Sequence, residues 1–212
     1  MTNRQRIART LAGVALTGAL AASLQGCVGV VVVGGVAAGA LVATDRRTLG
    51  AQTEDKEIAA KASDRLSGLV GDAGHVVATS YNRKVLLTGE VKDEKMKLDV
   101  VQEVKKIEGV QSVMDELEIG FPSSFGSRSD DALITGKISV TFINEKKLNA
   151  NSIKIVTERG IVYLMGRVTE PEGKIAAELA AGVSGVNKVI KVFEYISEDE
   201  LKKMTELQGA RS

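Results

Sequence analysis

The chain has 212 residues, which is enough for one domain or for two small domains with modest cores. Its formal net charge of +1 argues against the broad basic field that nucleic-acid-binding proteins use. With one Cys and one His, the chain cannot form an internal disulfide, and zinc, iron and Ser–His–Asp sites are not expected. Trp is absent and aromatic residues make up 3%, so surfaces that stack on bases or sugars are scarce. We therefore expect no metal, no diffusible cofactor and no nucleic-acid partner.

The first 26 residues have the pattern of a bacterial export signal. Three arginines precede an apolar run at 11–24, and residues 24–27 read Leu-Gln-Gly-Cys. This tetrapeptide resembles the lipobox, in which the cysteine thiol carries a diacylglycerol and the chain is cut just before it. We expect residues 1–26 to be removed and Cys27 to be acylated. The alternative is an ordinary secretory signal with an incidental cysteine. Val28, where many inner-membrane lipoproteins carry Asp, favours the outer membrane, facing the periplasm.

Residues 28–44 consist almost entirely of Val, Ala and Gly. The run is short for a bilayer span, and its four glycines disfavour a helix. We therefore interpret residues 27–53 as a lipidated apolar tether rather than a second transmembrane helix. The tether leads into the polar turn Asp45-Arg46-Arg47.

The rest of the chain repeats itself with a period of about 76 residues. Val85-Leu-Leu-Thr-Gly-Glu-Val matches Val162-Tyr-Leu-Met-Gly-Arg-Val, and Gly109-Val110 matches Gly185-Val186. The copies occupy residues 54–119 and 130–196. Residues 120–129 are rich in Gly, Ser and Pro and are typical of a flexible linker. We expect each copy to fold as its own domain.

Each copy has the pattern helix, hairpin, helix, strand. In the first copy we expect a helix with Ile58, Ala62 and Leu66 on one face, strands at 77–81 and 84–91, a helix at 94–107 and a strand at 110–119. In the second copy the corresponding elements are a helix at 131–143, strands at 153–157 and 161–168, a helix at 169–183 and a strand at 186–196. A C-terminal helix follows at 197–212. The crossover through the second helix makes its flanking strands parallel. The fold class is α+β, with a three-stranded mixed sheet and two helices per copy.

Tandem αββαβ units with a glycine that ends the hairpin and a Gly-Val pair before the last strand resemble BON domains. The resemblance covers residues 54–196. The lipobox, the apolar tether, residues 44–50 (Thr-Asp-Arg-Arg-Thr-Leu-Gly) and the motifs within 156–166 follow one another in an order that resembles the dual-BON lipoproteins. This resemblance implies a protein at the inner face of the outer membrane that binds anionic phospholipid, supports envelope integrity and catalyses no reaction. It also implies that the first helix of the second domain contacts the phospholipid.

The first helices of the two copies differ on one face. Their core stripes correspond, but Glu57, Asp64 and Ser67 of the first copy align with Leu133, Val140 and Ile143 of the second. This second apolar stripe, with Gly136 inside it and Lys137 beside it, has no evident core to enter, and such surfaces commonly mark interfaces. We interpret these five residues of the second copy as a lipid-binding face, with Lys146 and Lys147 near anionic headgroups. The alternatives are packing within the chain and a protein partner.

The remaining candidate residues are interpreted as structural. Gly89 and Gly166 end the hairpin strands, where a close backbone approach or a bulge needs a glycine. His75 has no ligand set around it, and the acidic pair Asp130-Asp131 opens a predicted helix. No nucleophile or acid–base constellation is evident, so we do not expect an enzyme. The leading hypothesis is a lipid-anchored phospholipid-binding protein. The alternative is a non-catalytic adaptor that docks on envelope or outer-membrane assembly proteins.

Overall fold

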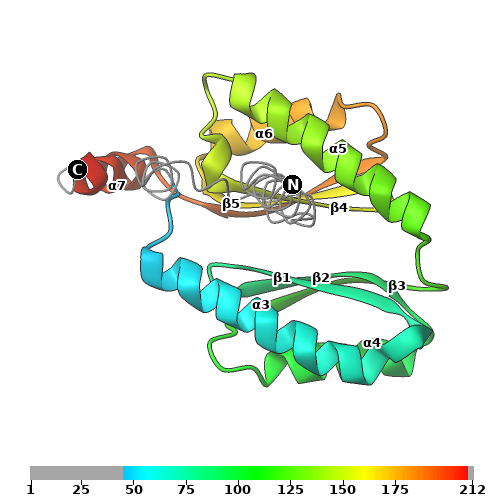
Figure 1. Cartoon of the computed structure of the whole chain (residues 1–212). Helices are drawn as coiled ribbons and strands as arrows, with labels where there is room; N and C mark the ends of the chain where they lie inside the picture. Colours follow the sequence, from blue (N-terminus) through cyan, green and yellow to red (C-terminus); the bar gives the residue numbers. More distant parts are fainter. Residues whose placement is uncertain (1–44, 210–212) are drawn as a thin grey trace, which may run out of the picture. The chain divides into compact units, whose positions relative to one another are not determined.

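The computed structural model describes residues 45–209 (Figure 1). The expected signal peptide, the acylated Cys27 and the tether up to residue 44 lie outside this range. Within it, no helix is both long and apolar enough to cross a bilayer.

The first domain has the expected order of elements. They are α3 (Leu49–Val70), a short 3-10 turn η1 (Gly71–Ala73), β1 (His75–Tyr81), β2 (Lys84–Val91), α4 (Glu94–Lys105) and β3 (Ser112–Ile119). The sheet has the order β1-β2-β3, with an antiparallel hairpin and a parallel third strand that pairs Val85 with Val113.

The second domain repeats this arrangement. Its elements are α5 (Phe125–Asn144), the turn η2 (Ala150–Ser152), β4 (Ile153–Glu158), β5 (Ile161–Val168), α6 (Glu170–Ala181) and β6 (Lys188–Tyr195), followed by α7 (Glu198–Gly209). The sheet order is β4-β5-β6, and β5 and β6 are parallel. The predicted α+β class and the mixed three-stranded sheets are confirmed. Most element ends differ from the expectation by only one or two residues, which is within the usual uncertainty of helix and strand limits.

Two boundaries differ more, because the first helix of each domain begins before the repeat that we identified. α3 begins at Leu49, inside the segment assigned to the tether, and α5 begins at Phe125, inside the segment assigned to the linker. The helices are capped alike: Thr48 Oγ1 accepts from the amide of Ala51, and Ser124 Oγ accepts from the amide of Ser127. The serines at 124–129 suggested a linker, but Ser124 caps the helix and the Ser129 hydroxyl donates to the carbonyl of Phe125.

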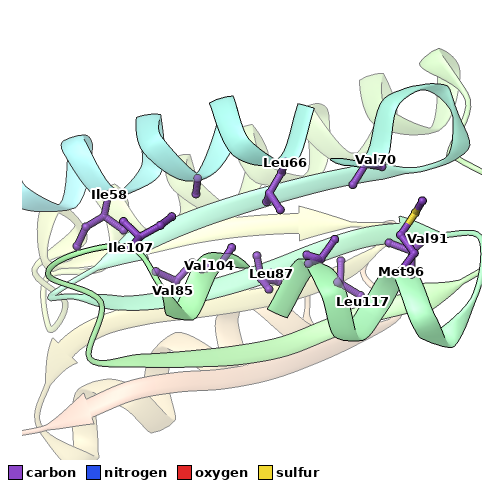
Figure 2. Close-up of a cluster of buried hydrophobic side chains, with 12 residues drawn as sticks. Ile58, Leu66, Val70, Val85, Leu87, Val91, Met96, Val104, Ile107 and Leu117 are labelled. Atoms are coloured by element: carbon purple, nitrogen blue, oxygen red, sulfur yellow. The ribbon is translucent and has the colours of Figure 1, made fainter. Parts of the chain in front are cut away.

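The core of each domain lies between its two helices and one face of its sheet. Figure 2 shows Ile58, Leu66 and Val70 of α3 directed toward the sheet and α4 of the first domain. In the second domain Ile134, Ile138 and Phe142 occupy the corresponding face of α5 and are buried. The buried stripes that the sequence spacing predicted are therefore confirmed.

The opposite faces of the two sheets pack against each other. A separate buried cluster draws on both domains and consists of Tyr81, Leu86, Tyr163, Met165 and Val192. Tyr81 also donates a hydrogen bond to the carbonyl of Ser152 across this interface at 3.1 Å. Both cores and this interface lie within residues 45–209, so a fragment 45–212 keeps every contact described here.

Candidate functional site

Helix α5 is fixed to its sheet by a buried carboxylate as well as by its apolar stripe. Asp131 Oδ2 accepts from the amide of Arg159 and Oδ1 accepts from the amide of Gly160, both at 2.8 Å. Arg159 and Gly160 have φ of +50° and +72°, so their hairpin turn leaves two neighbouring amides to be bonded. We expected Asp131 to act at the helix N-terminus; instead it is buried in the second turn and clamps the hairpin.

The outer face of α5 is apolar and exposed. Leu133, Val140 and Ile143 are 63%, 59% and 71% exposed. At about 100° per residue these side chains lie on the side of the helix opposite Ile134, Ile138 and Phe142. The alternative that the stripe packs within the chain is not seen in residues 45–209. Gly136 lies in the same stripe, and a Cβ added to it would meet no heavy atom within 4 Å, so the surface is open there.

Sequence reasoning missed one member of this stripe. Phe125, the first residue of α5, is 80% exposed and projects within about 20° of Gly136 on the helical wheel. It was missed because residues 120–129 were assigned to a linker. The signal was present in the repeat, since Thr48 and Ser124 are separated by the same 76 residues as Ile58 and Ile134. We refer to Phe125, Leu133, Gly136, Val140 and Ile143 as the outer strip.

The corresponding face of α3 is polar over most of its length, although the exposed Leu49 aligns with Phe125. Glu57, which aligns with Leu133, forms an ion pair with Lys61 at 2.8 Å. Asp64 and Ser67, which align with Val140 and Ile143, are exposed polar side chains. The same fold therefore presents a solvated helix in one domain and an apolar one in the other. The apolar face is a property of the second domain and not a requirement of the fold.

Three lysines adjoin the outer strip. Lys137 lies beside Leu133 on the helix, and both line a shallow pocket of about 470 Å³. Lys146 and Lys147 follow the end of α5, and all three lysines are exposed. None of them forms an ion pair with any residue between 45 and 209. Their charges are thus available to anions next to an apolar surface.

The segment that leads into α3 is held at the junction of the two domains. Arg46 makes a bidentate ion pair with Glu172 at 2.7 Å and donates to the carbonyl of Arg167, all in the second domain. Arg47 pairs with Asp55 of the first domain at 2.8 Å, and its guanidinium carbon lies 4.1 Å from the centre of the Tyr81 ring. The sequence predicted a simple polar turn here. In the structure, Arg46 instead bonds to the second domain and Arg47 to the first.

A second polar junction contains carboxylates that are poorly solvated. Glu90 of β2 is completely buried and pairs with Arg159 of the second domain. Glu158, next to Arg159, is also buried. Burial, followed by the charges of Glu90 and Asp131, raises the pKa of the Glu158 carboxyl to about 7. The second domain therefore carries a carboxyl group that titrates near neutral pH.

The geometry at Gly89 and Gly166 agrees with a structural role. Gly89 has a φ of +107°, and a Cβ there would lie 2.0 Å from the carbonyl oxygen of His75. A Cβ on Gly166 would lie 2.5 Å from the carbonyl oxygen of Ser152. At both positions the neighbouring backbone passes too close for any side chain.

The described residues offer no group of His, Cys, Asp and Glu side chains that could hold a metal ion. His75 is the first residue of β1 and half-buried, and burial lowers the pKa of its imidazole. Cys27 lies outside the described residues. The candidate site that remains is the outer strip with its lysines.

Two αββαβ units, each with an antiparallel hairpin and a parallel final strand, define a class of small tandem domains. The family model of the BON domain matches residues 54–120 and 130–197, and the chain belongs to this family. The outer membrane lipoprotein DolP of Haemophilus influenzae is 38% identical over 175 residues, which cover 82% of this chain and 90% of the relative. This chain is therefore a dual BON-domain protein similar to DolP.

Two further relatives share most of the chain. The 21 kDa hemolysin of Actinobacillus pleuropneumoniae is 30% identical over 154 residues, covering 72% of this chain and 79% of the relative. The osmotically-inducible protein Y of Escherichia coli is 26% identical over 190 residues, covering 88% of this chain and 94% of the relative.

Proposed function

We propose that this protein is a lipoprotein of the outer membrane, anchored through Cys27 and facing the periplasm, that binds anionic phospholipid and supports the integrity of that membrane. We propose no catalytic activity for it. The name of the DolP relative, an outer membrane lipoprotein, supports the location. The lipobox-like sequence at 24–27 supports the anchor.

The observation that carries the lipid-binding part is the exposure of Leu133, Val140 and Ile143 on the face of α5 opposite the core. Burying one such side chain in an apolar phase is worth about 1.5–3 kcal/mol, which favours a bilayer surface over water. Lys137 adds attraction to anionic headgroups. A protein that is already anchored by lipid meets a bilayer at high effective concentration, so a modest affinity is sufficient.

Binding of the 45–212 fragment to vesicles tests this proposal without the anchor. The fragment should sediment with phosphatidylglycerol vesicles, bind phosphatidylcholine vesicles much more weakly, and lose affinity as salt screens the lysines. A fragment that binds neither vesicle, but is retained by envelope proteins, would favour the adaptor alternative.

The anchor is tested separately in the full chain. Mass spectrometry should find Cys27 acylated at the mature N-terminus, and a Cys27→Ser variant should leave the membrane fraction after a salt wash. Retention of residues 1–26, or an unmodified thiol on a mature protein, would contradict the anchor and leave the vesicle result unaffected.

A further inference from the structure

The segment that joins the two domains exposes two of the four phenylalanines in the chain. Phe121 is 90% exposed and Phe125 is 80% exposed, whereas Phe142 and Phe193 are buried in the core of the second domain. Aromatic side chains carry a large apolar area, so two exposed rings only four residues apart in sequence are unusual for a chain with 3% aromatic residues.

The backbone that carries these rings is fixed by hydrogen bonds from both domains. The amide of Gly120 donates to the carbonyl of Val91 at 2.9 Å, and Arg159 Nη2 donates to the carbonyl of Phe121 at 2.9 Å. Beyond the proline, the amide of Ser123 donates to Glu90 Oε2 at 2.9 Å. The backbone that carries the rings is thus ordered. Binding a partner there would need little further ordering of this segment.

Phe125 also extends the outer strip to the whole length of α5. From Phe125 to Ile143 the helix rises about 27 Å, and the strip residues stay on one side of it. Ser129 is the polar residue that falls within this side, and its hydroxyl donates to the carbonyl of Phe125 at 3.0 Å. Its hydrogen bond is therefore satisfied inside the helix, and it does not interrupt the apolar surface.

We propose that Phe121 and Phe125 form the aromatic end of the lipid-binding face, so that α5 lies along the bilayer surface over its full length. This inference rests on the proposed function and adds the orientation of the helix and two contact residues. A long helix with an apolar side and flanking lysines is the pattern of interfacial helices, which lie in the plane of the membrane. The phenylalanine side chain has no hydrogen-bonding group. It can therefore enter the acyl-chain region without leaving a donor or acceptor unsatisfied. Continuity with Leu133 and Val140 identifies the bilayer as the occupant.

The absence of tryptophan from the chain allows a direct test. Single tryptophans are placed in the 45–212 fragment by Phe121→Trp, Phe125→Trp and Leu133→Trp. The matched control is Leu98→Trp, at a 56% exposed leucine of α4 in the first domain. With phosphatidylglycerol vesicles, the first three variants should show a blue shift and quenching by lipids brominated on their acyl chains. Leu98→Trp should show neither change.

The outcomes separate this inference from the proposed function. If Leu133→Trp responds but Phe121→Trp and Phe125→Trp do not, α5 binds through its middle only and the inference is overturned, while the proposed function stands. If none of the three responds, both are overturned. A blue shift that needs no vesicles and grows with protein concentration would assign the rings to a second copy of the chain, which also overturns the inference.

A substitution supplies a second readout. Phe125→Ser should lower the affinity of the fragment for phosphatidylglycerol vesicles about tenfold, since one large apolar side chain no longer enters the lipid. Its melting temperature should stay close to that of the parent fragment because the ring is exposed. Unchanged affinity in the folded variant would contradict the inference.

Discussion

Asp55 of α3 accepts a hydrogen bond from the backbone amide of Arg83 at 2.8 Å, and Asp131 of α5 accepts the equivalent bond from Gly160 at the same distance. In both domains one buried carboxylate thus bonds the two amides of the hairpin turn. Burial alone would raise the pKa of the Asp55 carboxyl, but hydrogen bonds from Ser80 and from the turn amides outweigh this and lower it.

Removal of this clamp should destabilise the protein. Asp131→Ala leaves two amides without their acceptor and should cost about 3 kcal/mol of the free energy of unfolding, measured by urea denaturation. Asp55→Ala should cost more, because it also removes the partner of Arg47. The control is Asp130→Ala at the exposed neighbouring position, which should change little. An Asp131→Ala variant as stable as this control would contradict the role assigned to the clamp.

The two hairpin glycines should tolerate no side chain. Gly89→Ala should lower the melting temperature more than Gly166→Ala, because it combines the closer contact with a positive φ. The matched control is Gly136→Ala on the open outer strip, which should raise stability by about 0.5–1 kcal/mol through its helix propensity. Equal melting temperatures for all three variants would show that the strands can move apart.

Glu158 should make stability depend on pH between its unfolded and folded pKa values, 4.5 and about 7. The folded protein binds the extra proton in this window, so ionisation of Glu158 lowers stability as the pH rises through 7. Glu158→Gln should therefore be more stable than the parent at pH 8, by at most about 3 kcal/mol, and the difference should vanish as the pH falls to 4.5. Urea denaturation across this range measures it. A difference that is independent of pH would mean that the carboxyl titrates normally in the folded state.

Arg46 should contribute to stability by joining the segment before α3 to the second domain. Its side chain and that of Glu172 are 6% and 13% exposed, so the pair is largely shielded from solvent. Arg46→Gln should cost up to about 3 kcal/mol in urea denaturation, because it leaves the largely shielded Glu172 carboxylate with the amide of Thr169 but without its charged partner. Lys61→Ala, which breaks the exposed pair with Glu57, is the control and should have little effect. If both substitutions lower the free energy of unfolding equally, the Arg46–Glu172 pair stabilises the protein no more than an exposed surface pair does.

The sequence predicted the parts of the fold that depend on local spacing. The stripes at Ile58 and Ile134 repeat every three to four residues and therefore identify helices. The runs that became β2 and β5 are rich in β-forming residues and follow a turn, which identifies them as hairpin strands. The exposure of Leu133 also followed from comparing the two copies. The interface formed by Tyr81 and Tyr163 was not predicted, because packing of sheet on sheet depends on contacts between residues far apart in the chain.

Two other features were missed for different reasons. The clamp at Asp131 was missed because a carboxylate near a helix start has two possible roles, and only the position of the hairpin turn decides between them. Phe125 was missed because Ser and Gly favour both linkers and helix caps. The partners of Asp131 are 28 and 29 residues away in the chain, whereas the cap that starts α5 before Phe125 is local and could be found by aligning the two copies.

The most direct test of the membrane-binding proposal is the affinity of the Leu133→Glu fragment for phosphatidylglycerol vesicles. The substitution removes an inserted side chain and adds a negative charge, so the affinity should fall at least tenfold while the melting temperature stays unchanged. Leu98→Glu, at the comparably exposed leucine of α4, is the control and should bind like the parent fragment. A stable Leu133→Glu fragment that binds vesicles as tightly as the parent would contradict the proposal.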